Sequence, residues 1–306
     1  MPPIVGNLAF NAMPPSPFDP RAGFFEHAAL AALRLTGCQS ANVATSSGRV
    51  HVLTAQGAGP GTPVVLLHGF SSACVHYGVL MHHLRRQVRR VIAPDAPAHG
   101  FSDQPEKVDA PALQAGLLEA LDKVVDEPAI VYGNSMGGLA ALRFALHRPE
   151  RVKGLVLCSP VGAPMDQHEI GRFLRRFELD DHSRALAFVD RVFKTDGAFR
   201  HLLAWGVRRK FSHPVMRELL GSFDADDLLV PEELQSLKPP VLFVWGRSER
   251  VLPPEHRDFF LEHLPAGSRV EEPLRFGHGP YLEHPEAVAN QILAFERSLR
   301  LPDYLD

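Results

Sequence analysis

The stretch Gly133-Asn134-Ser135-Met136-Gly137 places a serine between two glycines. An apolar, β-branched run at residues 129–132 comes just before it, and residues 139–145, whose composition favours a helix, follow it. A serine in this G-x-S-x-G setting is typical of a nucleophile elbow, a sharp turn between a strand and a helix. Glycine is needed at the flanking positions because a side chain there would clash with neighbouring backbone. Ser135 is therefore a candidate nucleophile.

A serine hydroxyl is a weak nucleophile until a base accepts its proton, and the base needs an acid to orient it. The C-terminal third of the chain predicts two strands, at residues 241–245 and 268–271. Glu249 follows the first predicted strand and His278 follows the second. The ordinary pKa of histidine lies near neutrality, which suits proton transfer in both directions. The order along the chain predicts a triad of Ser135, Glu249 and His278.

The chain resembles the α/β-hydrolase superfamily from about residue 50 to residue 299. Four further motifs carry this resemblance besides the elbow: His68-Gly69-Phe70 after a predicted strand, the run 95–103 that matches a D-x-x-x-H-G-x-S-D loop, Trp245-Gly246-Arg247-Ser248-Glu249, and Gly277-His278 with Glu283-His284-Pro285-Glu286. One position departs from the pattern, because the family usually carries aspartate where this chain has Glu249. Glutamate is an accepted triad acid, although its side chain is one methylene longer.

The resemblance implies an α/β fold with a mostly parallel central sheet flanked by helices, and with an inserted helical cap. It implies that His278 acts as general base and then general acid, and that Glu249 orients the imidazole. The oxyanion hole would use the backbone N–H groups of Met136 and Phe70. The other conspicuous polar residues of the motifs are expected to organise loops: His68, Asp95, His99, Asp103 and Glu283.

The pattern of elements predicts three parts. Residues 1–40 are expected to form an N-terminal arm and a helix, and residues 41–160 with 239–306 to form the core domain. Regular strand–helix alternation stops after Cys158, and residues 161–238 carry helix-like, aromatic-rich stretches. The resemblance assigns this insertion to a cap over the serine.

The function predicted from these features is the hydrolysis of carboxylic esters, of the carboxylesterase type, through an acyl-enzyme at Ser135. The elbow Gly133-Asn134-Ser135-Met136-Gly137-Gly138 is also similar to that of hydrolases that split carbon–carbon bonds in ring-fission dienones. A perhydrolase or an acyltransferase would use the same triad. A ligand-binding module on the same fold is the non-enzymatic alternative, and a membrane-associated lipase is a further one, motivated by the helix predicted from Phe24 to Leu35 and by the apolar cap.

The composition of the chain excludes several classes of binding partner. The 306 residues have a formal net charge of −3 and no long basic run, so a nucleic-acid partner is not expected. No run of about 18 apolar residues predicts a membrane span, and no charged-then-apolar leader opens the chain. Three scattered cysteines do not form a disulfide framework or a metal motif. We expect a cytoplasmic enzyme without cofactor or metal, whose partner is a small ester with an apolar part; the sequence leaves the oligomeric state open.

Overall fold

The central element is one sheet of eight strands. The computed structural model of the protein describes residues 22–193 and 197–300, so the predicted arm at residues 1–20 lies outside the described residues. The strand order is β1-β2-β4-β3-β5-β6-β7-β8. The β1–β2 and β2–β4 pairs are antiparallel, and the other neighbouring pairs are parallel. The strands are β1 (Cys38–Thr45), β2 (Gly48–Gln56), β3 (Val64–Leu67), β4 (Arg90–Pro94), β5 (Ala129–Asn134), β6 (Val152–Cys158), β7 (Val241–Val244) and β8 (Arg269–Glu271).

The apolar runs predicted as strands are buried on both faces of this sheet. In β3, Val64 and Leu66 belong to the core on one face, whereas Val65 and Leu67 belong to the core on the other. Side chains alternate between the two faces of a strand, so a strand covered on both sides must be apolar at every position. This explains why residues 64–67 show no polar alternation.

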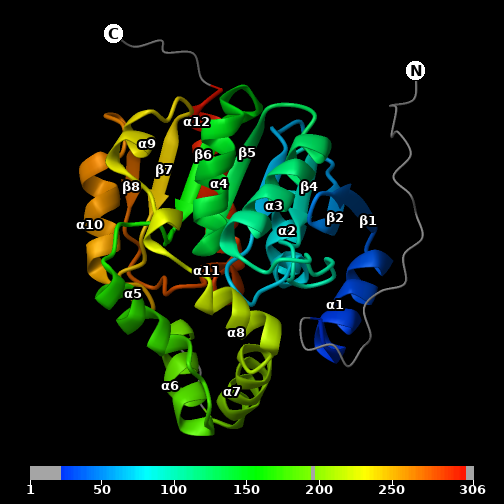
Figure 1. The fold of residues 1–306 in the computed structure, drawn as a ribbon. Coiled ribbons are helices and arrows are strands. Elements are labelled where there is room, and N and C mark those ends of the chain that lie inside the picture. Colours follow the sequence, from blue (N-terminus) through cyan, green and yellow to red (C-terminus); the bar gives the residue numbers. More distant parts are fainter. Residues whose placement is uncertain (1–21, 194–196, 301–306) are drawn as a thin grey trace.

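Helices cover the two faces of the sheet, as Figure 1 shows. One face packs against α1, α2, α11 and α12, and the other packs against α3, α4, α9 and α10. The α/β-hydrolase fold class predicted from the sequence is therefore confirmed. The helices are α1 (Phe24–Leu35), α2 (Gly78–Leu84), α3 (Ala110–Val124), α4 (Met136–His147), α5 (Gln167–Leu174), α6 (His182–Val192), α7 (Ala198–Phe211), α8 (Pro214–Gly221), α9 (Pro231–Gln235), α10 (Pro254–His263), α11 (Pro280–Glu283) and α12 (Pro285–Ser298).

The chain between β6 and β7 forms α5 to α9 and leaves the sheet. Asp166 and Asp181 accept hydrogen bonds from backbone N–H groups in the first turns of α5 and α6, which explains where these helices begin. In Figure 1, α6 and α7 extend beyond the end of the sheet. They share a small apolar core of their own, formed by Leu179, Ala185, Phe188, Val189, Ala204 and Phe211.

The two ends of this insertion remain attached to the main core. Phe173 of α5 and Leu234 of α9 pack into the apolar core on one face of the sheet. Strands β3, β5, β6 and β7 lie side by side in parallel and end at the edge that the insertion covers. Loops that follow such strand ends are where α/β sheets carry their ligand sites. Among the described residues, no helix has the length and apolar character to cross a membrane.

Candidate active site

Ser135 occupies the turn at which β5 passes directly into α4. Its backbone has φ 56° and ψ −121°, a conformation that favours glycine over residues with a side chain. The Ser135 N–H donates to the Cys158 carbonyl at 3.1 Å, and the Ser135 carbonyl accepts from the N–H groups of Gly138 at 2.9 Å and Val161 at 3.2 Å. These bonds hold the strained residue in place.

The two glycines of the elbow are required by close backbone contacts. A Cβ on Gly133 would lie 2.1 Å from the Gly137 carbonyl oxygen. A Cβ on Gly137 would lie 2.0 Å from the Leu67 carbonyl oxygen at the end of β3. Both distances are far below van der Waals contact, so the tight turn predicted from G-x-S-x-G is a steric necessity of this fold.

Glu249 and His278 come together from the turns after β7 and β8. The Glu249 Oε2 atom lies 2.8 Å from His278 Nδ1. The other oxygen, Oε1, accepts hydrogen bonds from the N–H groups of Val251 at 2.7 Å and Leu252 at 3.1 Å. One glutamate thus binds both its own turn and the histidine.

The charge of Glu249 is stabilised although its side chain is only 2 % exposed. Burial alone would raise its pKa, but the imidazole of His278 and the two backbone N–H groups lower the pKa to about 2. Because Glu249 is ionised at neutral pH, it can only accept a hydrogen bond, and the nitrogen that faces it must carry a proton. His278 Nδ1 therefore carries the proton, which leaves Nε2 as the basic nitrogen of the neutral ring.

Asn134, to which the sequence analysis gave no role, connects the elbow with the histidine loop. Its Nδ2 donates to the His278 carbonyl at 2.7 Å and to the Cys158 carbonyl at 3.0 Å. The residue is 2 % exposed. Asn134 is adjacent to Ser135, so these two bonds fix the position of the His278 backbone relative to the elbow. Position 134 is a variable position of G-x-S-x-G, so the motif predicts no role for its side chain.

The loop after β3 lies against the elbow. A Cβ on Gly69 would be 3.2 Å from the Ser135 Cβ, which shows how closely the loop approaches. His68 holds this loop: its Nδ1 donates to the Gly69 carbonyl at 2.8 Å, and its Nε2 accepts from the Ala96 N–H at 3.0 Å. Burial lowers the pKa of His68, consistent with a neutral ring that both donates and accepts.

The backbone N–H groups of Phe70 and Met136 are available near Ser135. Met136 is the first residue of α4, where N–H groups lack partners within the helix. Within residues 22–193 and 197–300, no acceptor is hydrogen-bonded to either N–H. The Phe70 side chain packs against Phe177 and Phe211 of the insertion, so it links this loop to the helices above.

Ser135 and His278 line one cavity of about 1020 Å³. Helices α5 to α8, α1 and the loop after β3 also contribute to its wall. Most of its lining is apolar, with an aromatic cluster near the insertion formed by Phe70, Phe173, Phe177, Phe188 and Phe211. A cavity of this size and character can hold an apolar molecule of drug or lipid-chain dimensions.

One wall of the cavity carries a charged group that the sequence analysis missed. Glu26 of α1 forms an ion pair with Lys210 of α7, and His76 Nε2 lies 3.5 Å from the same Glu26 oxygen. Burial would raise the pKa of Glu26, but His76 and Lys210 hold it well below its ordinary value. The Ser72 hydroxyl continues the network to His76 Nδ1 at 2.9 Å. No spacing signal marks this group, because its members come from three distant segments.

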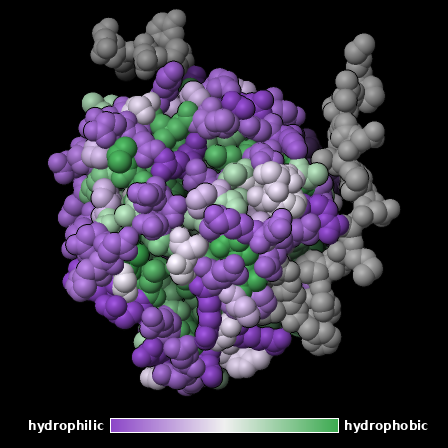
Figure 2. Space-filling model, in the orientation of Figure 1, coloured by the Kyte–Doolittle hydropathy of each residue, from purple (hydrophilic) through white to green (hydrophobic). Residues whose placement is uncertain are grey.

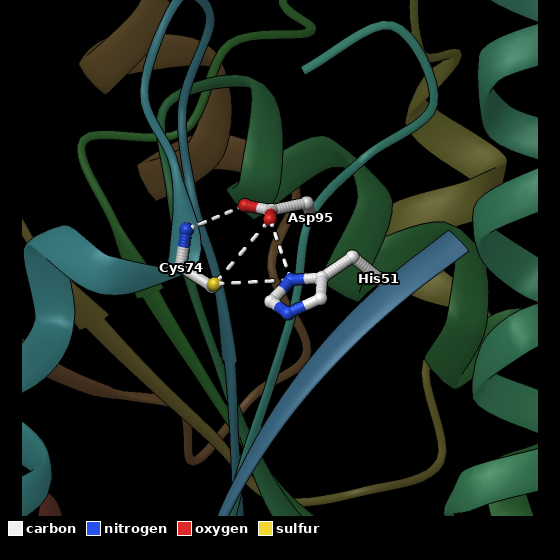
Figure 3. A group of neighbouring side chains, drawn as sticks. All are labelled: His51, Cys74 and Asp95. Atoms are coloured by element: carbon white, nitrogen blue, oxygen red, sulfur yellow. Dashed lines mark hydrogen bonds and ion pairs between the residues drawn. The ribbon is translucent and has the colours of Figure 1, made fainter. Parts of the chain in front are cut away.

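Asp95 lies beside His51 and Cys74, as Figure 3 shows. Its carboxylate accepts from the N–H groups of Cys74 at 2.6 Å and Phe101 at 3.0 Å, and from His51 Nδ1 at 2.9 Å. The Cys74 Sγ atom lies 3.4 Å from Asp95 Oδ2 and 3.6 Å from His51 Nδ1. These three side chains could hold a metal ion, yet their contacts are those of a buried carboxylate that receives every hydrogen bond it needs.

The loop after β4 is organised by a second carboxylate besides Asp95. Asp103 binds Arg49 through two side-chain bonds of 2.8 and 3.0 Å and one backbone bond of 3.0 Å. Neither Asp95 nor Asp103 lines the cavity of Ser135. Both lie where a residue that organises a loop would be expected.

Comparison with known proteins shows the family of this chain. The model of the alpha/beta hydrolase family matches residues 64–291. Esterase YbfF of Escherichia coli is 27% identical over 258 residues, which cover 79% of this chain and 96% of that protein. The 2-hydroxy-6-oxo-6-phenylhexa-2,4-dienoate hydrolase of Burkholderia cepacia is 29% identical over 276 residues, covering 82% and 92%.

A solved structure agrees as well. The carboxylesterase CesB of Bacillus subtilis is 22% identical, with a TM-score of 0.70, and the match covers 89% of this chain and 96% of that one. At this identity the likeness shows the fold, whereas the family model covers well over half of the chain in sequence. This chain belongs to the alpha/beta hydrolase family.

Proposed function

We propose that the protein hydrolyses carboxylic esters, with Ser135 as nucleophile and His278 and Glu249 as its base and orienting acid. The Ser135 oxygen attacks the ester carbonyl while His278 Nε2 takes the hydroxyl proton. The alcohol leaves with that proton, which gives an acyl-serine. Water then attacks the acyl-serine, again losing a proton to His278, and the acid and free Ser135 are released.

The observation that carries this proposal is the Glu249–His278 hydrogen bond of 2.8 Å. His278 lines the same cavity as Ser135, which lies on a strained turn. The buried Glu249 carboxylate keeps its charge because His278 and two backbone N–H groups lower its pKa. Paired with His278, it fixes the ring tautomer that a general base requires. A ligand-binding role without catalysis would not explain why Ser135 has a strained backbone.

Backbone N–H groups supply the second half of the chemistry. We propose that the backbone N–H groups of Phe70 and Met136 bind the oxyanion that forms on the carbonyl oxygen of the ester. Donors that are fixed before the reaction stabilise developing charge more than mobile water does, and one such donor contributes about 3–4 kcal/mol to transition-state stabilisation. Because no acceptor among the described residues is bound to them, these N–H groups are available for this role.

We further propose the division of the chain that the sequence predicts. Residues 1–40 would form the arm and helix, residues 41–160 and 239–306 the catalytic core, and residues 161–238 the cap. The separate apolar core of α6 and α7 and their contribution to the cavity wall support a cap.

Carbon–carbon bond hydrolysis is the second candidate. A dienoate hydrolase is among the relatives, at 29% identity over 82% of this chain. The loop His68-Gly69-Phe70-Ser71-Ser72 has a single glycine after the histidine, where that class usually has more. Esterases among the relatives, together with the largely apolar cavity, favour ester cleavage for this chain.

The test is hydrolysis of p-nitrophenyl butyrate by wild type and by Ser135→Ala, compared at equal concentration. We expect the variant to lose about 10³- to 10⁶-fold in kcat, because removal of a triad nucleophile abolishes acyl-enzyme formation. Matching circular dichroism and melting curves serve as the folding control. A folded wild type that cleaves no ester but cleaves a ring-fission dienone would move the assignment to carbon–carbon hydrolysis.

A further inference from the structure

Large apolar side chains are exposed around the mouth of the Ser135 cavity. Phe25 of α1 is 64% exposed, and Phe199, Leu202 and Trp205 of α7 are 58%, 46% and 53% exposed. Leu282 of α11 is 39% exposed. All five also line the cavity, and we call them the apolar rim. Exposed apolar residues that gather at one place on a surface mark a binding face, whereas scattered ones do not.

The main helix of the rim is basic. Helix α7 contains four positively charged side chains and no aspartate or glutamate. Lys210 is paired with Glu26 and Arg200 with Asp190. Arg208 and Arg209 are exposed. The Arg209 guanidinium lies 5.7 Å from the centre of the Trp205 ring. Two exposed guanidinium groups therefore stand next to the exposed aromatic residues.

This combination fits a lipid–water boundary. A helix with Trp, Leu and Phe on one side and arginine beside them lies with its apolar side in the acyl layer and its charges among anionic headgroups. Figure 2 shows hydrophobic residues that reach the surface at several places of this face, the lower part of the view included, among many hydrophilic residues.

We propose that the apolar rim docks the cavity mouth onto the surface of an anionic lipid aggregate. An apolar ester would then pass from the lipid into the cavity without crossing water. The rim comes from three elements and surrounds an opening, so it suits a fluid surface that needs no shape complementarity. An acidic protein would also attract Arg208 and Arg209, but it would leave the ring of apolar side chains without a reason.

The substrate class in this proposal rests on the ester hydrolysis proposed above, whereas the docking step does not. Docking can therefore be measured with Ser135→Ala, which would leave the lipid intact. The probe is a vesicle of phosphatidylcholine with phosphatidylglycerol, and the control is a vesicle of phosphatidylcholine alone.

The chain carries its own reporter for this measurement. It has two tryptophans, and Trp245 is only 6% exposed, so a change of emission on adding vesicles reports on Trp205. We expect a blue shift and co-sedimentation with the anionic vesicles, both weakened by high salt and by omission of phosphatidylglycerol.

Substitutions in the rim separate apolar insertion from general charge attraction. Leu202→Ser should weaken vesicle binding about fivefold by removing inserted apolar surface. The double variant Arg208→Ser with Arg209→Ser should weaken it about 25-fold, at about fivefold for each arginine. Matched controls are Leu261→Ser, an exposed leucine of α10 outside the cavity, and Arg86→Ser, an exposed arginine after α2. Both controls should bind as the parent does.

Three outcomes would overturn the docking proposal. They are no binding to either vesicle, equal losses in the rim and control variants, and a loss on arginine substitution with none for Leu202→Ser. The last outcome would indicate an electrostatic face for an acidic partner. Wild-type hydrolysis of a dissolved short ester is measured in parallel, so failure of docking and failure of the esterase proposal give different results.

Discussion

Glu249 keeps its charge in a buried position because its hydrogen bonds are worth more in the ionised form. Its folded-state pKa of about 2 lies below the ordinary value of 4.5, so the ionised carboxylate stabilises the fold above pH 4.5. This contribution falls as the pH drops toward 2. Its full size corresponds to about 3 kcal/mol, because each pKa unit is equivalent to about 1.4 kcal/mol.

The pH dependence of stability tests this residue. Glutamine approximates the neutral acid, so the difference in free energy of unfolding between wild type and Glu249→Gln should shrink by about 2 kcal/mol from pH 7 to pH 3. Urea unfolding at several pH values measures it. Parallel stability curves for the two proteins would show that Glu249 is not held in the ionised state by the fold.

Asn134 offers a second prediction at this scale. Removing its bonds to the His278 and Cys158 carbonyls should let the His278 loop shift, because each bond fixes one side of it. We expect Asn134→Ala to lower kcat about tenfold on a soluble ester, with KM within about twofold. Asn134→Asp places an acceptor against two carbonyl oxygens and should lower kcat further. A fully active Asn134→Asp would contradict a positioning role.

Individual residues differ in how far the sequence predicts them. Ser135, Glu249 and His278 were found because each follows a predicted strand in the expected order. Asn134 was quoted with its motif but received no role, since its partner carbonyl belongs to a loop far along the chain. Local patterns give the position of a side chain on its own element; they do not give the distant group that folding brings to it.

At the scale of elements, the insertion is tied to the turn that carries Glu249. Arg176, in the short 3₁₀ turn Arg175–Phe177 after α5, donates from Nη1 to the Val251 carbonyl at 2.6 Å. The N–H of the same Val251 donates to Glu249 Oε1 at 2.7 Å. Arg176 therefore links the proposed cap to the turn that carries Glu249.

A double-mutant cycle can test this coupling. Arg176→Met should lower kcat about tenfold in the wild type, because a charge-assisted bond to the turn is lost. In the Glu249→Gln background the same substitution should have a smaller effect, since both act through the orientation of His278. Arg172→Met, at an exposed position of α5, is the matched control. If the losses of kcat in the two single variants add up in the double variant, Arg176 does not act through the turn that carries Glu249.

Helices and strands were predicted well where composition is decisive. The helix-like stretches predicted between residues 161 and 238 correspond to α5 with its 3₁₀ turn, α6, α7 and α8. The predicted strands at residues 241–245 and 268–271 correspond to β7 and β8. The sequence does not predict how these helices pack against the rest of the molecule, because packing partners such as Phe70 and Phe211 are distant in sequence.

The wall of the cavity comes from widely separated parts of the chain. The loop after β3, the helices of the insertion and helix α1 all contribute to the wall. The ion pair of Glu26 with Lys210 joins the first helix to the roof. The sequence predicts the helix from Phe24 to Leu35, but composition cannot reveal a contact between such remote segments.

The volume of this cavity predicts an acyl-length preference. Each methylene that moves from water into an apolar cavity contributes about 0.8 kcal/mol, or about fourfold in kcat/KM. With about 1020 Å³ available, we expect kcat/KM for p-nitrophenyl esters to rise from acetate to at least octanoate. Initial rates below the solubility limit measure it. A maximum at acetate would mean that the acyl chain does not enter the cavity.

The strained backbone of Ser135 has a consequence for how this protein could change over time. Positive-φ geometry at a residue with a side chain costs on the order of 1–3 kcal/mol, and the surrounding fold must supply that stability. Replacement by glycine would relieve the strain and yield a sturdier but inert protein. Selection for stability alone would therefore favour glycine at this position, and serine is expected there only where its hydroxyl group has a function.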